Sequence, residues 1–88
     1  MPLRNISFTP EGWRDYQYWF NQDKKTLAKI NKLISETCRD PFLGTGKPEP
    51  LKENYAGYWS RRIDKQNRLV YSATENSLVV IACRFHYQ

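Results

Sequence analysis

The residues best suited to chemistry gather at the end of the chain, in the run "CRFHYQ". This run contains the only histidine of the sequence, His86, with Arg84 two positions before it and Tyr87 directly after it. Histidine has a reference pKa of about 6.5, so it can give or take a proton near neutral pH. A lone histidine is more often structural than catalytic, and His86 therefore needs chemical partners elsewhere in the chain before it indicates a site.

A carboxylate and several cations in the second half of the chain are such partners. Glu49 and Lys52 lie in "GKPEPLK", and Arg62 and Arg68 follow in "WSRRI" and "NRLVY". Metal-independent cleavage of RNA needs a base for the 2′-hydroxyl, an acid for the departing 5′-oxygen and cations that hold the charge on phosphorus. The sequence has no P-loop, no acidic cluster for metals and no Ser-His-Asp spacing. Composition and spacing still leave RNA cleavage as one option among several.

The elements that must position these side chains follow from hydrophobic periodicity and from turn residues. The run 4–8 alternates as a short strand, and Thr9 followed by Pro10 is typical of a helix start. A second helix is predicted from Asp23 to Asp40, because the proline that follows Asp40 removes a backbone donor and restricts the residue before it.

The second half of the chain is predicted to be a long loop followed by three strands with hairpin-length connections. One strand, two helices and then an antiparallel meander predict an α+β fold, with the helices covering one face of a small twisted sheet. At 88 residues the chain suits one domain, so we expect residues 1–88 to form a single domain. The loop is expected at 41–55 and the strands at 58–64, 68–74 and 78–86.

Strand alternation predicts which side chains share a face of that sheet. Trp59 and Ile63 are expected on one face and Ser60 and Arg62 on the other, with Arg68 on the face of Arg62. In the last strand, the uniformly apolar set is expected to pack on the helices: Val79, Ile81, Cys83 and Phe85. The open face would then hold Arg62, Arg68, Arg84 and His86, but a turn one residue longer or shorter would scatter them.

The charge of the chain favours an anionic partner. Fourteen Lys and Arg against nine Asp and Glu give a net charge of +5, which suits nucleic acid or an acidic protein. The lysines of the second helix are expected to form a solvated face, as such lysines usually do. Contact with RNA is the alternative. Cys38 and Cys83 lack metal-ligand spacing and are expected to be buried free thiols. Because no signal peptide or transmembrane run is found, we expect a cytoplasmic protein without a membrane partner.

Four motifs, "GKPEPLK", "WSRRI", "NRLVY" and "CRFHY", in this order and spacing, resemble the YoeB (Txe) toxins of bacterial toxin–antitoxin systems, within the RelE superfamily. The resemblance covers nearly the whole chain. It implies a microbial-RNase-like α+β fold and a toxin that enters the ribosomal A site, cuts the mRNA there and stops translation. It also implies a YefM (Phd)-type antitoxin with a disordered acidic segment. YoeB-like toxins are often dimeric, so a homodimer is an option. From the residues themselves we expect no cofactor and no metal.

The same resemblance implies a role for each matching residue of the site. Glu49 would be the general base on the 2′-hydroxyl, and His86 the general acid towards the 5′-oxygen. Arg68 would stabilise the transition state, and Tyr87 would lie at the reacting phosphate. The expected products are a 2′,3′-cyclic phosphate, or its opened 3′-phosphate, and a 5′-hydroxyl.

Three further cations are expected to bind RNA or phosphate. By the resemblance, Lys52 and Arg62 contact phosphate or orient the nucleotide, and Arg84 joins them because alternation places it on the open face. Arg61 has the opposite strand parity and is expected to be structural or to contact ribosomal RNA.

Two other functions are open from the sequence. One is a non-catalytic RelE-like module that binds the ribosome or RNA without cutting, against which the joint presence of Glu49, Arg68, His86 and Tyr87 argues. The other is a structural or DNA-binding protein. The sequence has no helix-turn-helix pattern and gathers its candidate ligands on a sheet, which argues against DNA binding.

Overall fold

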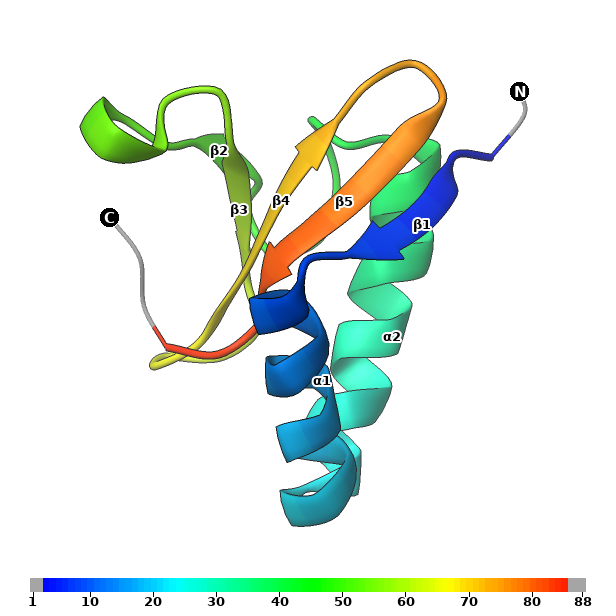
Figure 1. The fold of residues 1–88 in the computed structure, drawn as a ribbon, viewed down its shortest axis with the longest axis vertical. Helices are drawn as coiled ribbons and strands as arrows, with labels where there is room; N and C mark the ends of the chain where they lie inside the picture. Colours follow the sequence, from blue (N-terminus) through cyan, green and yellow to red (C-terminus); the bar gives the residue numbers. More distant parts are fainter. Residues whose placement is uncertain (1–2, 86–88) are drawn as a thin grey trace.

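The computed structural model describes residues 3–85. It has the predicted order of one strand, two helices and then β-structure (Figure 1), which confirms the α+β fold. The short strand β2 was not predicted, because it lies inside the expected loop. The elements are β1 (Asn5–Phe8), α1 (Pro10–Gln22), α2 (Lys24–Arg39), β2 (Glu49–Pro50), a 3₁₀ turn (Glu53–Tyr55), β3 (Trp59–Arg62), β4 (Arg68–Ala73) and β5 (Ser77–Ala82).

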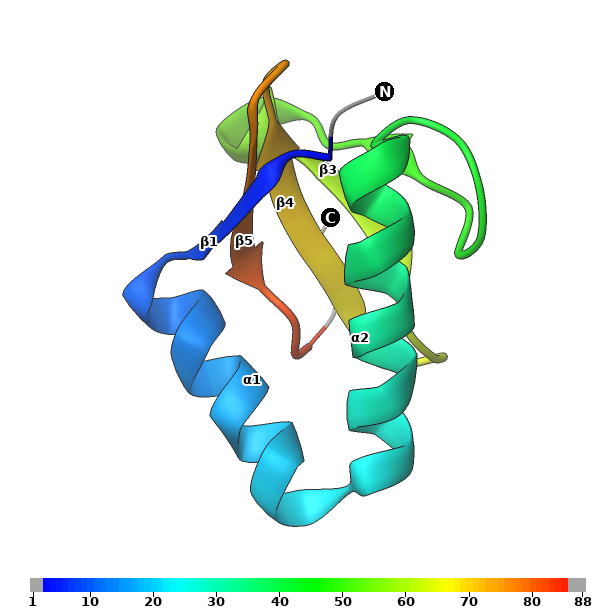
Figure 2. The same ribbon diagram turned by 90° about the vertical axis from the view of Figure 1, so that its right-hand side faces the viewer.

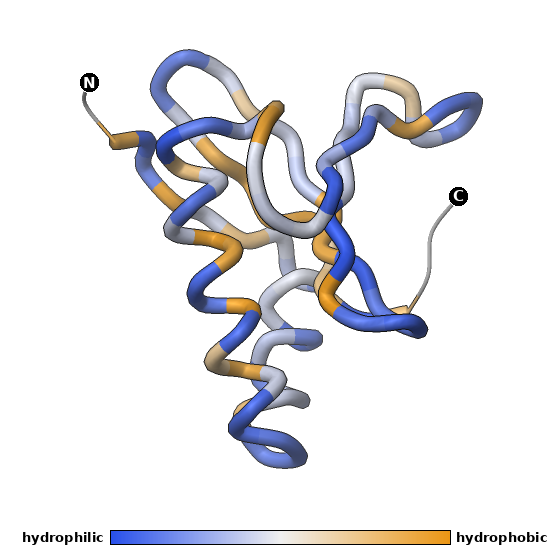
Figure 3. Tube along the Cα trace, turned by 180° about the vertical axis from the view of Figure 1, so that it is seen from behind, coloured by the Kyte–Doolittle hydropathy of each residue, from blue (hydrophilic) through white to orange (hydrophobic). Residues whose placement is uncertain are grey.

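The five strands form one mixed sheet in the order β1-β5-β4-β3-β2. β1 runs parallel to β5, and the other neighbours are antiparallel. The helices form an antiparallel pair joined at one end (Figure 2), and along α2 hydrophobic residues alternate with hydrophilic ones (Figure 3). Ile30 and Leu33 of α2 pack against Leu69, Tyr71 and Leu78 on the face of the sheet that the helices cover. We call the opposite face of β2, β3 and β4 the open face.

The helix boundaries follow the predicted capping residues. The Thr9 hydroxyl accepts a hydrogen bond from the Gly12 N–H (3.1 Å), with proline at the first helical position. The Asp23 carboxylate accepts from the N–H groups of Lys25 (3.0 Å) and Thr26 (3.2 Å), which caps α2. Within residues 3–85, neither helix is long and apolar enough to cross a membrane.

The facing of β5 differs from the prediction up to Ile81, which was expected against the helices and packs with Val70 instead. Leu78 and Val80 lie in the core beneath the helices, and a β-bulge between the partners of Val70 and Tyr71 inserts one extra residue into β5. Beyond the bulge, Ala82 packs with Val70 on the open side. Alternation alone could not choose the facing, because every second residue on either side of β5 is apolar.

Arg61 on β3 has a fully buried side chain, which is rare for a charged residue. Its Nη1 donates to the Glu36 carboxylate (3.0 Å) and to the Thr45 carbonyl (3.1 Å). Its Nη2 donates to the Leu43 carbonyl (2.7 Å) and to the Asp40 carbonyl. The guanidinium therefore joins β3 to α2 and to the segment after α2, so the structural alternative predicted for this arginine is the one observed.

The end of β5 is fixed to α1 by two hydrogen bonds at Cys83. The Asp15 carboxylate accepts from the Cys83 N–H (3.0 Å), and the Trp19 indole N–H donates to the Cys83 carbonyl (2.7 Å). Burial raises the pKa of Asp15 above its usual 3.8 and outweighs the opposite effect of the Cys83 hydrogen bond. Burial also raises the pKa of the Cys83 thiol to about 12. Cys38 and Cys83 are buried free thiols, as predicted.

We expect Arg61→Met to lower the free energy of unfolding by about 3–5 kcal/mol, the usual cost of removing one partner from a buried charged network. The backbone carbonyls would lose their donor, whereas Glu36, with a side chain 33% exposed, can rehydrate. Urea denaturation beside the matched variant Arg62→Met tests this, because Arg62 is exposed and should cost less than about 0.5 kcal/mol. Equal losses for the two variants would contradict the role given to Arg61.

We expect wild type to gain stability relative to Asp15→Asn as the pH falls from neutral to 3.8, through the raised pKa of Asp15. The folded protein holds a proton on Asp15 more readily than the unfolded chain, so ionised Asp15 weakens folding at neutral pH. Asparagine keeps an acceptor for the Cys83 N–H and does not titrate. Urea denaturation of both proteins over a pH series gives the difference, in which other groups cancel. A relative loss of wild-type stability on acidification would oppose the prediction.

Candidate active site

The strands β2, β3 and β4 are neighbours in the sheet (Figure 1). Three polar side chains, one from each strand, meet on their open face. Arg68 on β4 donates from Nε to the Ser60 hydroxyl on β3 (3.0 Å) and from Nη2 to the Glu49 carboxylate on β2 (2.8 Å). Glu49 and Ser60 are partners in the β2–β3 ladder, so the two acceptors lie side by side. The structure brings together the predicted residues Glu49 and Arg68, and it adds Ser60.

The two members of the ion pair differ in exposure. The Arg68 side chain is 6% exposed, and that of Glu49 is 60% exposed. Burying a cation is costly unless it is well paired, and a pair with an exposed carboxylate contributes only about 0–1 kcal/mol. Within residues 3–85, the Arg68 guanidinium donates hydrogen bonds to Ser60 and Glu49. The charge of Arg68 is therefore weakly compensated and favours a further anion.

Two more predicted cations lie near this pair. Arg62 is the partner of Arg68 in the β3–β4 ladder, so both lie on the open face, where like charges directly opposite each other repel. Lys52 is the residue before the 3₁₀ turn, two positions beyond β2. The side chains of Arg62 and Lys52 are exposed. This cationic surface attracts anions such as phosphate.

Glu49 reaches the open face because the segment before β2 is fixed. Arg61 holds its first part, and further on the Gly46 carbonyl accepts from the Arg62 N–H (2.7 Å). Gly46 has φ 86°, which glycine adopts without strain, and a Cβ there would lie 3.0 Å from the Arg62 carbonyl oxygen. Lys47 follows with φ 51°, and the chain then enters β2.

Arg84 lies elsewhere than on the open face, so that part of the prediction is wrong. Its guanidinium carbon is 3.5 Å from the centroid of the Tyr18 ring on α1. The reason is that β5 ends at Ala82 and α1 binds the backbone of Cys83, so strand alternation does not extend to Arg84. The structure thus places this cation beside the first helix.

The turn between β3 and β4 holds the backbone just before the last predicted catalytic residues. The Asn67 amide oxygen accepts from the Phe85 N–H (2.8 Å), and the Arg68 N–H donates to the Phe85 carbonyl (2.9 Å). Phe85 has φ 68°, an uncommon conformation for a bulky residue. His86 and Tyr87 themselves lie outside the described residues.

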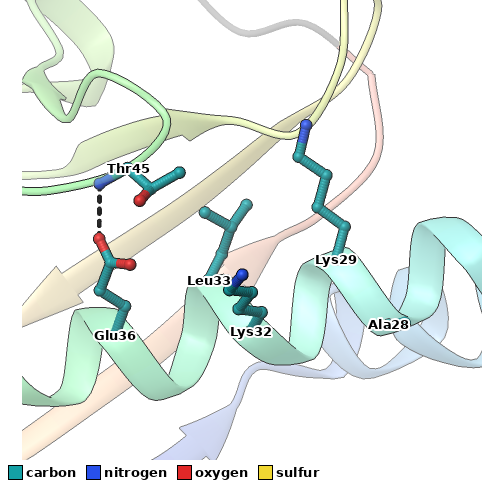
Figure 4. Close-up of a pocket in the computed structure, with 6 residues that line it drawn as sticks. All are labelled: Ala28, Lys29, Lys32, Leu33, Glu36 and Thr45. Carbon is teal, nitrogen blue, oxygen red and sulfur yellow. Dashed lines mark hydrogen bonds between the residues drawn. The ribbon is translucent and has the colours of Figure 1, made fainter.

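A shallow pocket of ≈ 360 Å³ lies elsewhere, on α2 and the segment that follows it (Figure 4). Within it, the Thr45 N–H donates to Glu36 (2.5 Å), and this hydrogen bond is the main cause that lowers the pKa of Glu36. The lining is part of the Arg61 network and contains none of the predicted site residues. It consists of Ala28, Lys29, Lys32, Leu33, Glu36 and Thr45.

Sequence reasoning missed two residues that organise the site. Ser60 was placed on the face of Arg62 but was given no role, although a hydroxyl among arginines on one face was a usable signal. Asn67 lies in the hairpin-length connection between the strands expected at 58–64 and 68–74, which by itself indicates no role in a site. Its bond to Phe85 joins positions 18 residues apart, and nothing in the local pattern indicates such a contact.

Comparison with known proteins identifies one family. The model of the "YoeB-like toxin of bacterial type II toxin-antitoxin system" matches residues 8–87. The chain is 54% identical to Toxin YoeB of Streptomyces coelicolor and 55% identical to Toxin YoeB of Escherichia coli K12. Each match spans 82 residues, which are 93% of this chain and 98% of the relative.

Solved structures agree with the sequence comparison. The YoeB dimer from Staphylococcus aureus superposes with a TM-score of 0.90 at 42% identity, over 98% of this chain and 100% of that chain. The YoeB-YefM complex from the same organism gives a TM-score of 0.86 at 41% identity, with the same coverage. Because both the family model and these relatives match nearly the full length, the chain belongs to the YoeB-like toxins of bacterial type II toxin–antitoxin systems.

Proposed function

We propose that this toxin is a ribosome-dependent endoribonuclease that cleaves mRNA in the ribosomal A site and so inhibits translation. The observation that carries the proposal is the Glu49–Arg68 pair on the open face. It supplies a carboxylate and a weakly compensated cation with 2.8 Å between Oε1 and Nη2. A base and a cation are the groups needed to activate a 2′-hydroxyl and to hold the charge that grows on phosphorus.

The proposed reaction is an attack of the ribose 2′-oxygen on the neighbouring phosphorus. Glu49 takes the 2′-hydroxyl proton, the new O–P bond forms, and the negative charge on the phosphoryl oxygens is met by Arg68. The bond between phosphorus and the 5′-oxygen breaks, and His86 donates a proton to that oxygen. The products are a 2′,3′-cyclic phosphate, or the 3′-phosphate after hydrolysis, and a 5′-hydroxyl.

The remaining predicted residues take binding roles in this proposal. Arg62, opposite Arg68, and Lys52, two residues beyond β2, add positive charge near the pair and suit contacts to phosphates or to the nucleotide. Tyr87 would lie at the reacting phosphate. Arg84, which stacks on Tyr18, would meet the RNA backbone only along the edge formed by α1.

The partners proposed are the ribosome with its mRNA, an antitoxin and a second copy of the chain. A YefM-type antitoxin is supported by the YoeB-YefM complex of Staphylococcus aureus, and a homodimer by the YoeB dimer of the same organism. The net charge of +5 suits both ribosomal RNA and an acidic antitoxin segment. Action on translating ribosomes would place the protein in the cytoplasm.

We expect Glu49→Gln and His86→Ala each to lower the cleavage rate by about 10²-fold or more, the usual range for the loss of a proton-transfer group. Primer extension on mRNA in a purified translation reaction measures the cuts, with untranslated message as the control. Cuts confined to translated message would support the proposal. A variant that cuts at the wild-type rate would remove that residue from the mechanism. Stalled translation with intact message would favour the alternative, a non-catalytic ribosome-binding module.

We expect Arg68→Ala to slow the chemical step by about 10²-fold or more while ribosome binding changes little. The reason is that only contacts that strengthen in the transition state raise the rate. Single-turnover cleavage at saturating ribosomes isolates this step. Arg39→Ala, which removes an exposed arginine from the end of α2, is the charge-matched control. A normal single-turnover rate with weakened binding would make Arg68 a binding residue only.

A further inference from the structure

Ser60 lies at the centre of the site without a role in the proposed reaction. It is fully buried on β3, and its hydroxyl oxygen accepts from the Nε–H of Arg68 at 3.0 Å. Because the Arg68 side chain is also nearly buried, water has little access to this bond. A shielded hydrogen bond to a charged donor is stronger than an exposed one, so the bond fixes one edge of the guanidinium.

Glu49 holds a different edge of the same guanidinium, and much less firmly. Its carboxylate accepts from Nη2, but the side chain is 60% exposed and lies on a strand of two residues at the edge of the sheet. Water and salt weaken an ion pair in such a position. The exposed Arg62, opposite Arg68, attracts a phosphate to this part of the open face, and displacement of the exposed Glu49 would open Nη2 of Arg68 to it. Phosphate oxygens match the guanidinium fork, so a phosphate competes well for Nη2.

We infer that Ser60 is the positioning residue for Arg68: it holds Nε in place while Nη2 exchanges Glu49 for a phosphate oxygen. This inference rests on the proposed function. The guanidinium is planar and rigid, so an anchor at Nε sets the direction of the whole fork. The exchange frees the Glu49 carboxylate at the moment when a 2′-hydroxyl is near, and the only transfer is the 2′-hydroxyl proton to Glu49. Ser60 thereby keeps the Arg68 guanidinium in its orientation, and Glu49 becomes available as the base.

The first test is the single-turnover cleavage rate of Ser60→Ala at saturating ribosomes. A misdirected cation costs about 10-fold to 10²-fold in rate, so we expect a fall of at least tenfold with ribosome binding unchanged. Ser72→Ala is the matched control, because Ser72 lies on the face of Arg68, further along β4, and makes no hydrogen bond to it. The control should cut within twofold of wild type.

The second test asks whether Ser60 acts through Arg68. Lysine has no N–H at the ε position, so in an Arg68→Lys background Ser60→Ala should slow cleavage by less than twofold. An equal slowing in both backgrounds would show that Ser60 acts by another route. A Ser60→Ala protein that cuts as fast as wild type would overturn the inference while the proposed function stands. Wild type that leaves translated message intact would overturn both.

A third measurement needs no variant and covers the case in which Ser60→Ala does not fold. A single-stranded DNA oligonucleotide lacks the 2′-hydroxyl and serves as an uncleavable phosphate probe. Nitrogen-15 and carbon-13 NMR follow the Arg68 Nε–H and the Glu49 carboxyl carbon of wild type during its addition. We expect the Nε–H signal to stay slowly exchanging while the Glu49 signal moves. If the Nε–H signal is lost while the Glu49 signal does not move, then Ser60 is the partner that phosphate displaces and Glu49 the one that stays, and the inference is wrong.

Discussion

The interaction on which the site depends is the buried guanidinium of Arg61. The segment between α2 and β2 has no regular secondary structure over most of its length, so its carbonyl groups need partners from elsewhere. Arg61 supplies them at three positions of that segment and also binds the Glu36 carboxylate on α2. The Arg61 side chain therefore pairs backbone carbonyl groups that backbone N–H groups would pair in a helix or a sheet. The Tyr71 hydroxyl and the Arg62 N–H add one bond each, to the Pro41 and Gly46 carbonyls, so Arg61 makes the largest contribution to the path that brings Glu49 to the edge of the sheet.

Because side chains alternate along β3, the same strand supplies both the buried Arg61 and residues of the open face. Ser60 and Arg62 lie on the open face, and Arg61, between them in sequence, points into the helix side. A shift of one residue would exchange these roles, so the register has to be well fixed. The turn after β3 contributes, because the Asp64 carboxylate accepts from the Asn67 N–H (2.8 Å) and from the Asn67 side-chain amide (3.1 Å). The same asparagine then holds Phe85, so the register and the path of the C-terminal segment are coupled.

The sequence was sufficient for the helices, their caps and the strands β3 and β4, because their hydrophobic periodicity and capping residues are clear. The relative facing of β3 and β4 depended on the length of the turn between them, and the observed register agrees with the predicted one. The sequence was insufficient for β5, where both sides are apolar and the bulge has no local signal, and hence for Arg84. The pairing of Glu49 with Arg68 depends on a strand of two residues, which is too short to show a period. The motifs named both residues through resemblance. Their contact, and the part played by Ser60, required the three-dimensional arrangement of three strands.

The two buried arginines, Arg61 and Arg68, differ in how well their charges are compensated, which indicates a structural role for the first and a functional role for the second. Within residues 3–85 every buried side-chain nitrogen and oxygen has a partner, and Arg61 is surrounded by acceptors. Arg68 instead relies on a hydroxyl and an exposed carboxylate, and Arg62 lies opposite it. Natural proteins tolerate such local conflicts mainly at functional sites. An anion on the open face would relieve the repulsion, whether it came from RNA or from an acidic antitoxin segment. The two proposed partners would then compete for the same cations, so occupation by one would exclude the other.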